Sequence, residues 1–159
     1  MRSEIQYTKK LDINKLIVGA VDFLKPIISN PLINIQNNLA PDLPLVTADK
    51  IQIEQVLVNL LLNAAESCED ERQTEIDIHT CINSDKYVLI EIIDTGSGIK
   101  EDIKQNIFEP FYTSKPNGLG MGLSISRTII ENHHDKIWAE TNPTGGTVLK
   151  VLLPTTQSN

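Results

Sequence analysis

An acidic residue and two glycines stand together at the end of a hydrophobic run. Residues 87–93 are apolar apart from one glutamate, and Asp94, Gly96 and Gly98 follow at once. We expect residues 87–94 to form a buried strand that presents a carboxylate and exposed backbone at one place. A carboxylate accepts hydrogen bonds from an exocyclic amine such as that of adenine, and glycine lets a ligand lie against the main chain. Taken alone, this pattern more often marks a plain turn.

Two asparagines, Asn59 and Asn63, lie four residues apart in an apolar segment. Residues 51–68 repeat apolar side chains at helical spacing after Asp49, a helix cap, so both amides would share one face. Buried amides need partners, so these side chains either bind neighbouring backbone or point into a cleft. A carboxamide oxygen suits Mg²⁺, which takes other ligands from water and substrate phosphates. Both a metal ligand and a satisfied buried amide fit this spacing.

A second glycine-rich segment precedes another helical pattern. Gly118, Gly120 and Gly122 occupy alternate positions before a helix expected over residues 122–132. The free N–H groups and the positive dipole at a helix start bind phosphate, and glycines let the anion approach. Lys115 could add a cation to the same phosphates, and a solvated surface lysine is the alternative. The glycine spacing alone is a weak signal because a loop, not a strand, precedes it.

Further elements must position these residues. Periodicity predicts a helix over residues 16–28 with Asp12 as its cap, and a short helix over residues 100–107. Residues 112–120 lack apolar periodicity and are expected to form a mobile loop. Thr147 follows a glycine pair in a tight turn, where its hydroxyl could support the carboxylate or a bound ring. Strand patterns fall at residues 33–36, 45–47, 74–83, 87–94, 136–141 and 147–153.

Composition limits the class of protein. A chain of 159 residues with 40% hydrophobic residues suits one compact domain with its own core. The net charge of −7 and the lack of a Lys/Arg cluster argue against a nucleic-acid-binding surface. Cys68 and Cys81 lack the spacing of a metal site or redox pair, so we expect buried thiols in a reducing compartment. No apolar run is long enough to span a membrane, which predicts a cytoplasmic domain whose parent could be membrane-anchored.

Taken in order, these motifs resemble the catalytic, ATP-binding domain of bacterial two-component sensor histidine kinases, which has the Bergerat or GHKL fold. The resemblance covers residues 12–154 and is closest to the oxygen- and nitrogen-regulating sensors. The family's boxes are matched by residues 59–63 (asparagine box), 94–98 (first glycine box), 108–111 (phenylalanine box), 118–123 (second glycine box) and 145–147 (terminal glycine box).

The resemblance implies a role for each matched position. Asp94 would bind the adenine amino group, and Asn63 would be the Mg²⁺ ligand. Asn59 and Lys115 would act on the phosphates as the catalytic residues, and residues 112–120 would form the ATP lid. The implied nucleotide-binding positions are Asn59, Asn63, Asp94, Gly96, Gly98, Ile99, Phe108, Lys115, Gly118, Leu119, Gly120, Met121, Gly122, Leu123 and Thr147.

Two positions depart from the family's pattern. Many relatives carry a basic residue three places after the second asparagine, where this chain has Glu66, so Lys115 is expected to matter more. Relatives commonly end the lid helix in His-Gly-Gly, whereas this chain has His133-His134-Asp135. Since glycine relieves left-handed strain at a helix end, this departure predicts a different cap.

The resemblance implies a two-layer α/β sandwich, with a mixed sheet of about five strands packed against three main helices. It implies an enzyme that binds Mg-ATP and phosphorylates a histidine on a separate dimerisation domain, with a response regulator downstream. None of His79, His133 and His134 has the sequence setting of that acceptor.

We therefore expect a fragment, monomeric by itself and cut from a homodimeric parent. Residues 1–11 would end a linker, residues 12–154 would form the catalytic domain, and residues 155–159 would be a tail. Two alternatives from other classes are a serine-directed anti-sigma-factor kinase of the same fold and a non-catalytic nucleotide-binding regulatory module.

Overall fold

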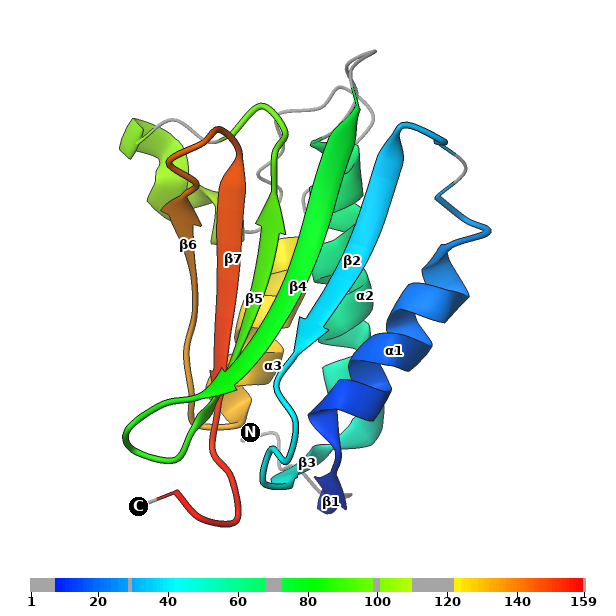
Figure 1. Cartoon of the computed structure of the whole chain (residues 1–159). Coiled ribbons are helices and arrows are strands. Elements are labelled where there is room, and N and C mark those ends of the chain that lie inside the picture. Colours follow the sequence, from blue (N-terminus) through cyan, green and yellow to red (C-terminus); the bar gives the residue numbers. More distant parts are fainter. Residues whose placement is uncertain (1–7, 29, 68–72, 99–100, 110–121, 159) are drawn as a thin grey trace.

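The fold has two layers, with three α-helices on one face of a five-stranded sheet (Figure 1). The computed structural model describes residues 8–28, 30–67, 73–98, 101–109 and 122–158. The elements are β1 (Thr8–Leu11), α1 (Ile13–Leu24), β2 (Ile33–Leu39), β3 (Val46–Asp49), α2 (Lys50–Glu66), β4 (Thr74–Ile82), β5 (Val88–Asp94), the 3₁₀ helix η1 (Glu101–Phe108), α3 (Gly122–Asn132), β6 (Ile137–Thr141) and β7 (Thr147–Leu153).

The main sheet has the strand order β2-β4-β5-β7-β6. Strand β2 runs parallel to β4, and the other neighbouring pairs are antiparallel, so the mixed sheet and the two-layer sandwich are confirmed. The strand expected at residues 45–47 does not join this sheet. It forms β3, which pairs with β1 in a separate two-stranded sheet. The pattern missed β1 because only Leu11 in it is apolar and buried.

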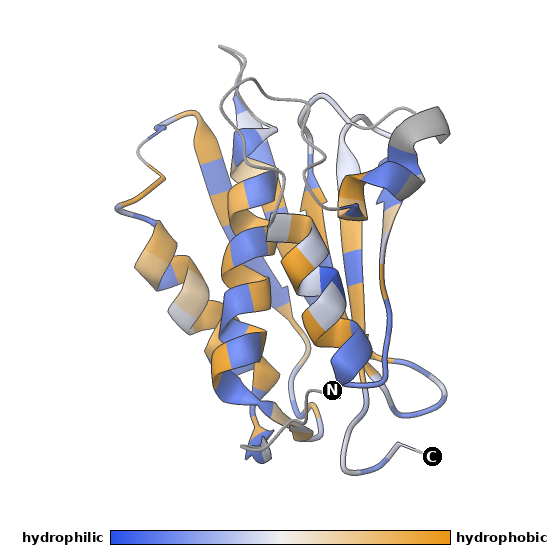
Figure 2. Cartoon of the chain, turned by 180° about the vertical axis from the view of Figure 1, so that it is seen from behind, coloured by the Kyte–Doolittle hydropathy of each residue, from blue (hydrophilic) through white to orange (hydrophobic). Residues whose placement is uncertain are grey.

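The helix α2 lies between α1 and α3 across the sheet (Figure 2). Asp49 begins it by accepting a hydrogen bond from the Gln52 N–H over 3.1 Å. Each large apolar side chain that α2 buries contributes roughly 1.5–3 kcal/mol, so its stripe is a main source of stability. The buried stripe consists of Ile53, Val56, Leu57, Leu60, Leu61 and Ala64.

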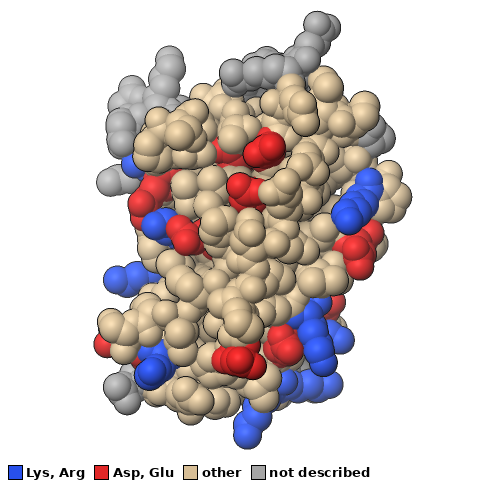
Figure 3. Space-filling model, in the orientation of Figure 1, with Lys and Arg blue, Asp and Glu red and all other residues tan. Residues whose placement is uncertain are grey.

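The strands alternate between a buried face toward the helices and an outer face. In β4 and β5, the side chains of Ile76, Ile78, Ile90 and Ile92 are at most 1% exposed. Charged side chains of both signs are scattered over the outer face among a larger area of other residues (Figure 3). There the ammonium group of Lys150 bridges two carboxylates, at 3.4 Å from Glu91 and 3.0 Å from Glu140. The period-2 alternation therefore sets which face of the sheet is packed.

The end of α3 corrects one prediction. His134 takes a left-handed conformation with φ of 64°, so the usual cap geometry is kept without glycine. The N–H of Asp135 donates to the carbonyl of Ile130 over 3.1 Å, and the N–H of His134 donates to that of Glu131 over 2.9 Å. These two bonds form a Schellman cap, whose hydrogen bonds offset a conformational cost of about 1–2 kcal/mol.

Two further predictions differ from the structure. Cys81 is exposed on the outer side of β4, near the strand's end, so the expectation of a buried thiol is wrong there. Cys68 lies outside the described residues. The first helix ends at Leu24, before the Ile28 expected from periodicity, because residues 25–27 form a turn. None of the helices in the described ranges has the length and apolar character needed to cross a membrane.

Candidate functional site

Asp94 ends the central strand β5 and is 2% exposed. One of its carboxylate oxygens accepts hydrogen bonds from the N–H of Gly96 over 2.9 Å and of Thr147 over 3.3 Å. Burial raises the pKa of Asp94, while these two N–H groups and the Ser67 hydroxyl act in the opposite direction. The donors hold one oxygen of the carboxylate in place at the end of the strand.

The turn between β6 and β7 closes over Asp94. The side-chain amide of Asn142 donates to the carbonyl of Asp94 over 3.1 Å, and its backbone N–H donates to the carbonyl of Gly146. Gly146 has φ of 101°, and a Cβ there would stand 2.0 Å from the Asp94 carbonyl oxygen. Only glycine permits this approach. Gly98 lies against the same turn, since a Cβ there would stand 3.3 Å from the Gly146 carbonyl oxygen.

Thr147 lies beside Asp94 and contacts its carboxylate through the backbone. The sequence predicts that its hydroxyl supports the carboxylate or a bound ring, and in the structure the bond to the carboxylate comes from its backbone N–H. Sequence reasoning missed Asn142, which is 9% exposed and 48 residues from its partner. An asparagine in a Thr-Asn-Pro turn segment carries no local signal for that contact.

The two asparagines lie on the same side of α2, one turn apart. The side-chain amide of Asn59 donates to the carbonyl of Gly122 over 3.3 Å and to the hydroxyl of Ser126 over 3.5 Å. Ser126 is fully buried. Through these two hydrogen bonds Asn59 joins α2 to the first turn of α3. Asn63 is half-buried and lies one turn closer to the C-terminal end of α2.

The donor set near α2 suits a cation that brings phosphate ligands with it. Within the described ranges, no three His, Cys, Asp or Glu side chains come together as a metal cluster. The carboxamide of Asn63 supplies a hard oxygen on a half-buried helix face, so the residues present fit Mg²⁺ bound mainly through water and phosphate. The same residues do not fit a cation whose ligands must all be protein side chains.

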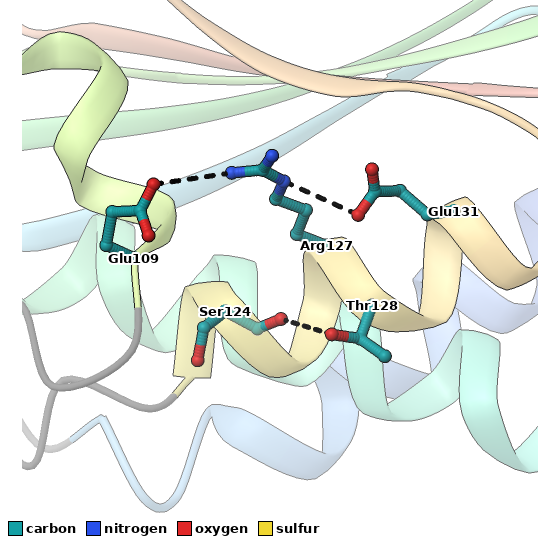
Figure 4. Close-up of polar contacts among 5 residues, drawn as sticks. All are labelled: Glu109, Ser124, Arg127, Thr128 and Glu131. Atoms are coloured by element: carbon teal, nitrogen blue, oxygen red, sulfur yellow. Dashed lines mark hydrogen bonds and ion pairs between the residues drawn. The ribbon is translucent and has the colours of Figure 1, made fainter. Parts of the chain in front are cut away.

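One ion pair joins α3 to the end of η1, and two further polar contacts lie within α3 (Figure 4). The guanidinium of Arg127 lies 3.9 Å from Glu109 after η1 and 3.5 Å from Glu131 on α3. These side chains are about half exposed, so each ion pair contributes ~1 kcal/mol or less. The hydroxyl of Thr128 donates to the carbonyl of Ser124 over 3.1 Å. Phe108 is buried at the end of η1, as part of the core.

Several expected site residues lie outside the described ranges. They include Lys115, which was expected to contact the phosphates, and most of the second glycine box. The expected lid over residues 112–120 also lies outside the described ranges. Gly122 and Leu123 are described and form the first turn of α3, where Leu123 packs against the core. The positions outside are Ile99, Phe111, Lys115, Gly118, Leu119, Gly120 and Met121.

The described site residues gather toward one end of the domain. The end of β5, the start of β7, the C-terminal half of α2 and the start of α3 all lie toward the upper end in Figure 1. This arrangement places a buried hydrogen-bond acceptor at one side and amide groups with a helix start at the other. An amine-bearing ring joined to phosphates matches both halves chemically.

Comparison with known families agrees with this geometry. The family model described as histidine kinase-, DNA gyrase B- and HSP90-like ATPase matches residues 48–157. Sensor protein FixL of Bradyrhizobium diazoefficiens is 41% identical over 127 residues, which cover 80% of this chain and 25% of FixL. The chain therefore spans about a quarter of the length of that sensor protein.

Solved structures show the same fold. The catalytic domain of histidine kinase ThkA superposes with a TM-score of 0.83 at 32% identity, covering 94% of this chain and 97% of that domain. ThkA in complex with the response regulator protein TrrA gives a TM-score of 0.79 at 30% identity, covering 94% of this chain and 42% of that one.

Proposed function

Because the chain belongs to the family of histidine kinase-, DNA gyrase B- and HSP90-like ATPases, we propose that it binds Mg-ATP and phosphorylates a histidine on a separate dimerisation domain. The homologues are sensor histidine kinases, which supports a role for the chain in two-component signalling. The proposed unit of catalysis is residues 12–154, preceded by the end of a linker and followed by a short tail.

The observation that carries the proposal is the buried carboxylate of Asp94 at the strand end. One oxygen is held by the N–H groups of Gly96 and Thr147, and the carboxylate retains acceptor capacity for a ligand. An exocyclic amine of adenine is the donor that this acceptor suits, at roughly 1.5–3 kcal/mol for a charged acceptor. Gly98 and Ile99 are proposed to line the same base pocket.

The phosphates are proposed to lie between α2 and the start of α3. Asn63 would ligate Mg²⁺, and Asn59, which already contacts the first turn of α3, would stand beside the phosphates. Lys115 and residues 118–123 would hold the β- and γ-phosphates, and residues 112–120 would form the lid. When bound, Mg²⁺ neutralises phosphate charge and orients the γ-phosphoryl group.

The transfer step requires positioning more than covalent chemistry from this chain. A neutral imidazole nitrogen of the acceptor attacks the γ-phosphorus, and the bond from that phosphorus to the β–γ bridging oxygen breaks. ADP leaves, a phosphorus–nitrogen bond forms, and the imidazole loses a proton to solvent. The site's own residues keep ATP in line and neutralise charge.

The acceptor is proposed to lie outside this chain. His133 is 5% exposed, and both of its ring nitrogens are engaged: Nε2 accepts from the N–H of Asp49 over 3.1 Å, and Nδ1 donates to the carbonyl of Ile129 over 2.8 Å. His79 lies within β4 and His134 in the cap of α3. The parent is therefore proposed to be a homodimer that carries the acceptor and a surface for a response regulator.

Radiolabelled ATP tests the proposal. The chain alone should bind Mg-ATP without acquiring label, and adding the helical acceptor domain, fused or at high concentration, should produce acid-labile label on that domain. Asp94→Asn in the same mixture should abolish the label.

Other outcomes identify the alternatives. Acid-stable label on a supplied serine substrate would identify a serine kinase. Tight ATP binding with no transfer to any acceptor would identify a regulatory module. Acid-labile label on the chain's own His79, His133 or His134 would contradict the separate acceptor.

A further inference from the structure

Asn142 follows the last residue of β6 and binds the last residue of β5. Its side-chain amide donates to the backbone carbonyl of Asp94 over 3.1 Å. Strand β7 lies between β5 and β6 in the sheet, so this hydrogen bond passes the start of β7. Gly146 precedes β7 there, and a Cβ on it would stand 2.0 Å from the same carbonyl oxygen. The bond therefore joins two strands that are not neighbours, and it depends on glycine at position 146.

Both ends of the Asn142 amide have partners. The amide oxygen accepts from the N–H of Thr144 over 3.3 Å and from the hydroxyl of the same residue over 3.1 Å. These partners fix the orientation of the amide, because a backbone N–H can only donate and the carbonyl of Asp94 can only accept. The oxygen side folds the turn through the N–H two residues on, as asparagine commonly does, and the nitrogen side holds Asp94.

The backbone of Asn142 closes the same turn. Its N–H donates to the carbonyl of Gly146 over 3.1 Å, and its carbonyl accepts from the N–H of Gly145 over 2.9 Å. The next residue is Thr147, whose N–H donates to the carboxylate of Asp94 over 3.3 Å. Asn142 thus acts on both polar groups of Asp94, on the backbone carbonyl directly and on the carboxylate through Thr147.

We propose that Asn142 is a positioning residue for base recognition, which fixes the Asp94 carboxylate in the orientation that accepts the 6-amino group of adenine. This inference rests on the proposed function of the site. One carboxylate oxygen accepts from the N–H groups of Gly96 and Thr147. A shift of the turn would therefore change the direction in which the carboxylate presents its remaining acceptor capacity.

The turn that Asn142 closes also borders the proposed base pocket. A Cβ on Gly98 would stand 3.3 Å from the carbonyl oxygen of Gly146, which is the oxygen that accepts from the N–H of Asn142. Asn142 and Asp94 are both buried, so water does not readily replace the bond between them. Asn142 therefore orders both the carboxylate that binds the amine and the backbone beside the ring.

The test compares two nucleotides that differ only in the amine. Purine riboside triphosphate carries hydrogen where ATP carries the 6-amino group, so the ratio of its dissociation constant to that of ATP measures recognition of the amine. Calorimetry with Mg²⁺ gives both constants for the unchanged chain and for Asn142→Ala, where circular dichroism shows both folded. The ratio should fall about two- to tenfold in the variant, which is the range that one neutral hydrogen bond contributes.

The ratio separates positioning from a merely structural role. A variant that only loosens the fold binds both nucleotides less well by the same factor, so its ratio stays unchanged. If Asn142→Ala does not fold, Asn142→Ser replaces it. A serine hydroxyl can accept from the N–H two residues on, as the amide oxygen does, and it lacks the nitrogen that reaches Asp94.

A matched control removes a bond from the other end of the same amide. Thr144 is exposed, and its hydroxyl donates to the amide oxygen of Asn142. Thr144→Val deletes that bond and leaves the bond to Asp94, so it should keep the nucleotide ratio of the unchanged chain. A ratio that stays the same in Asn142→Ala, or falls equally in Thr144→Val, overturns the inference while the proposed function stands. Failure of the unchanged chain to bind ATP overturns both.

Discussion

Two adjacent glycines in the turn between β6 and β7 should respond very differently to the same substitution. Gly145 and Gly146 have φ of 103° and 101°, so an alanine at either position carries the same type of backbone strain, about 1–2 kcal/mol. Around Gly145 nothing lies within 4 Å of the added Cβ. The Cβ added at Gly146 would stand 2.0 Å from the backbone carbonyl oxygen of Asp94 and 2.9 Å from its side-chain oxygen.

The clash at Gly146 cannot be relieved by moving a side chain. The opposing atom belongs to the backbone of β5, which is hydrogen-bonded on both sides within the sheet, so the turn itself must move. Movement breaks the bonds of Asn142 and Thr147 to Asp94 and the bond of Asn142 to Gly146. Since neutral hydrogen bonds contribute about 0.5–1.5 kcal/mol and charged ones about 1.5–3, Gly146→Ala should cost about 3 kcal/mol or more beyond Gly145→Ala.

Guanidinium denaturation followed by circular dichroism measures the free energy of unfolding of both variants, and calorimetry measures their ATP affinity. Gly145→Ala should unfold at slightly lower denaturant and retain binding. Gly146→Ala should lose much of a stability that is typically about 5–15 kcal/mol, and its remaining folded fraction should bind ATP poorly. A difference below about 1 kcal/mol between the variants, or normal ATP binding by Gly146→Ala, would refute the contact with Asp94.

Three other substitutions follow from single contacts. Asp94→Asn should weaken ATP binding at least about thirtyfold, which is about 2 kcal/mol, and equal affinity by calorimetry would remove Asp94 from the site. It should not lower stability at neutral pH: folding raises the pKa of Asp94, so the charged form opposes folding above that pKa, and the amide removes this cost. Asn63→Ala should weaken Mg-ATP far more than magnesium-free ATP, and equal weakening would make the residue structural. His133→Ala leaves the N–H of Asp49 without its acceptor and should cost about 2–4 kcal/mol, or about 5–10 °C in Tm. The exposed neighbour His134 gives the control, since His134→Ala should change Tm little. A similar fall in Tm for both variants would contradict the buried contact of His133.

Local chemistry determined the helices and the long strands. Aspartates at positions 12 and 49 cap the first two helices because their carboxylates reach N–H groups three residues on. The apolar stripe of α2 and the alternation in β4 and β5 follow from periods of 3.6 and 2 residues. The two asparagines share a face of α2 for the same reason, so much of the site could be anticipated from spacing.

Only the tertiary structure decided which distant residues meet. Asp94 receives its bonds from positions 142 and 147 because the strand order places β7 beside β5, a choice that no local pattern encodes. The same holds for the partners of Asn59 on α3 and for the pairing of β1 with β3.

Conformation could also depart from local preference where contacts outweigh it. His134 adopts the left-handed cap that sequence preference assigns to glycine, because two hydrogen bonds at the end of α3 offset its cost. Ser67 lies against the segment after Asp94 because Gly96 has no side chain, since a Cβ there would stand 2.6 Å from the Ser67 carbonyl oxygen. This close approach is visible only once the two segments are folded together. Spacing along the chain thus determined the elements and the residue types of the site, and packing between elements decided the partners of each polar group.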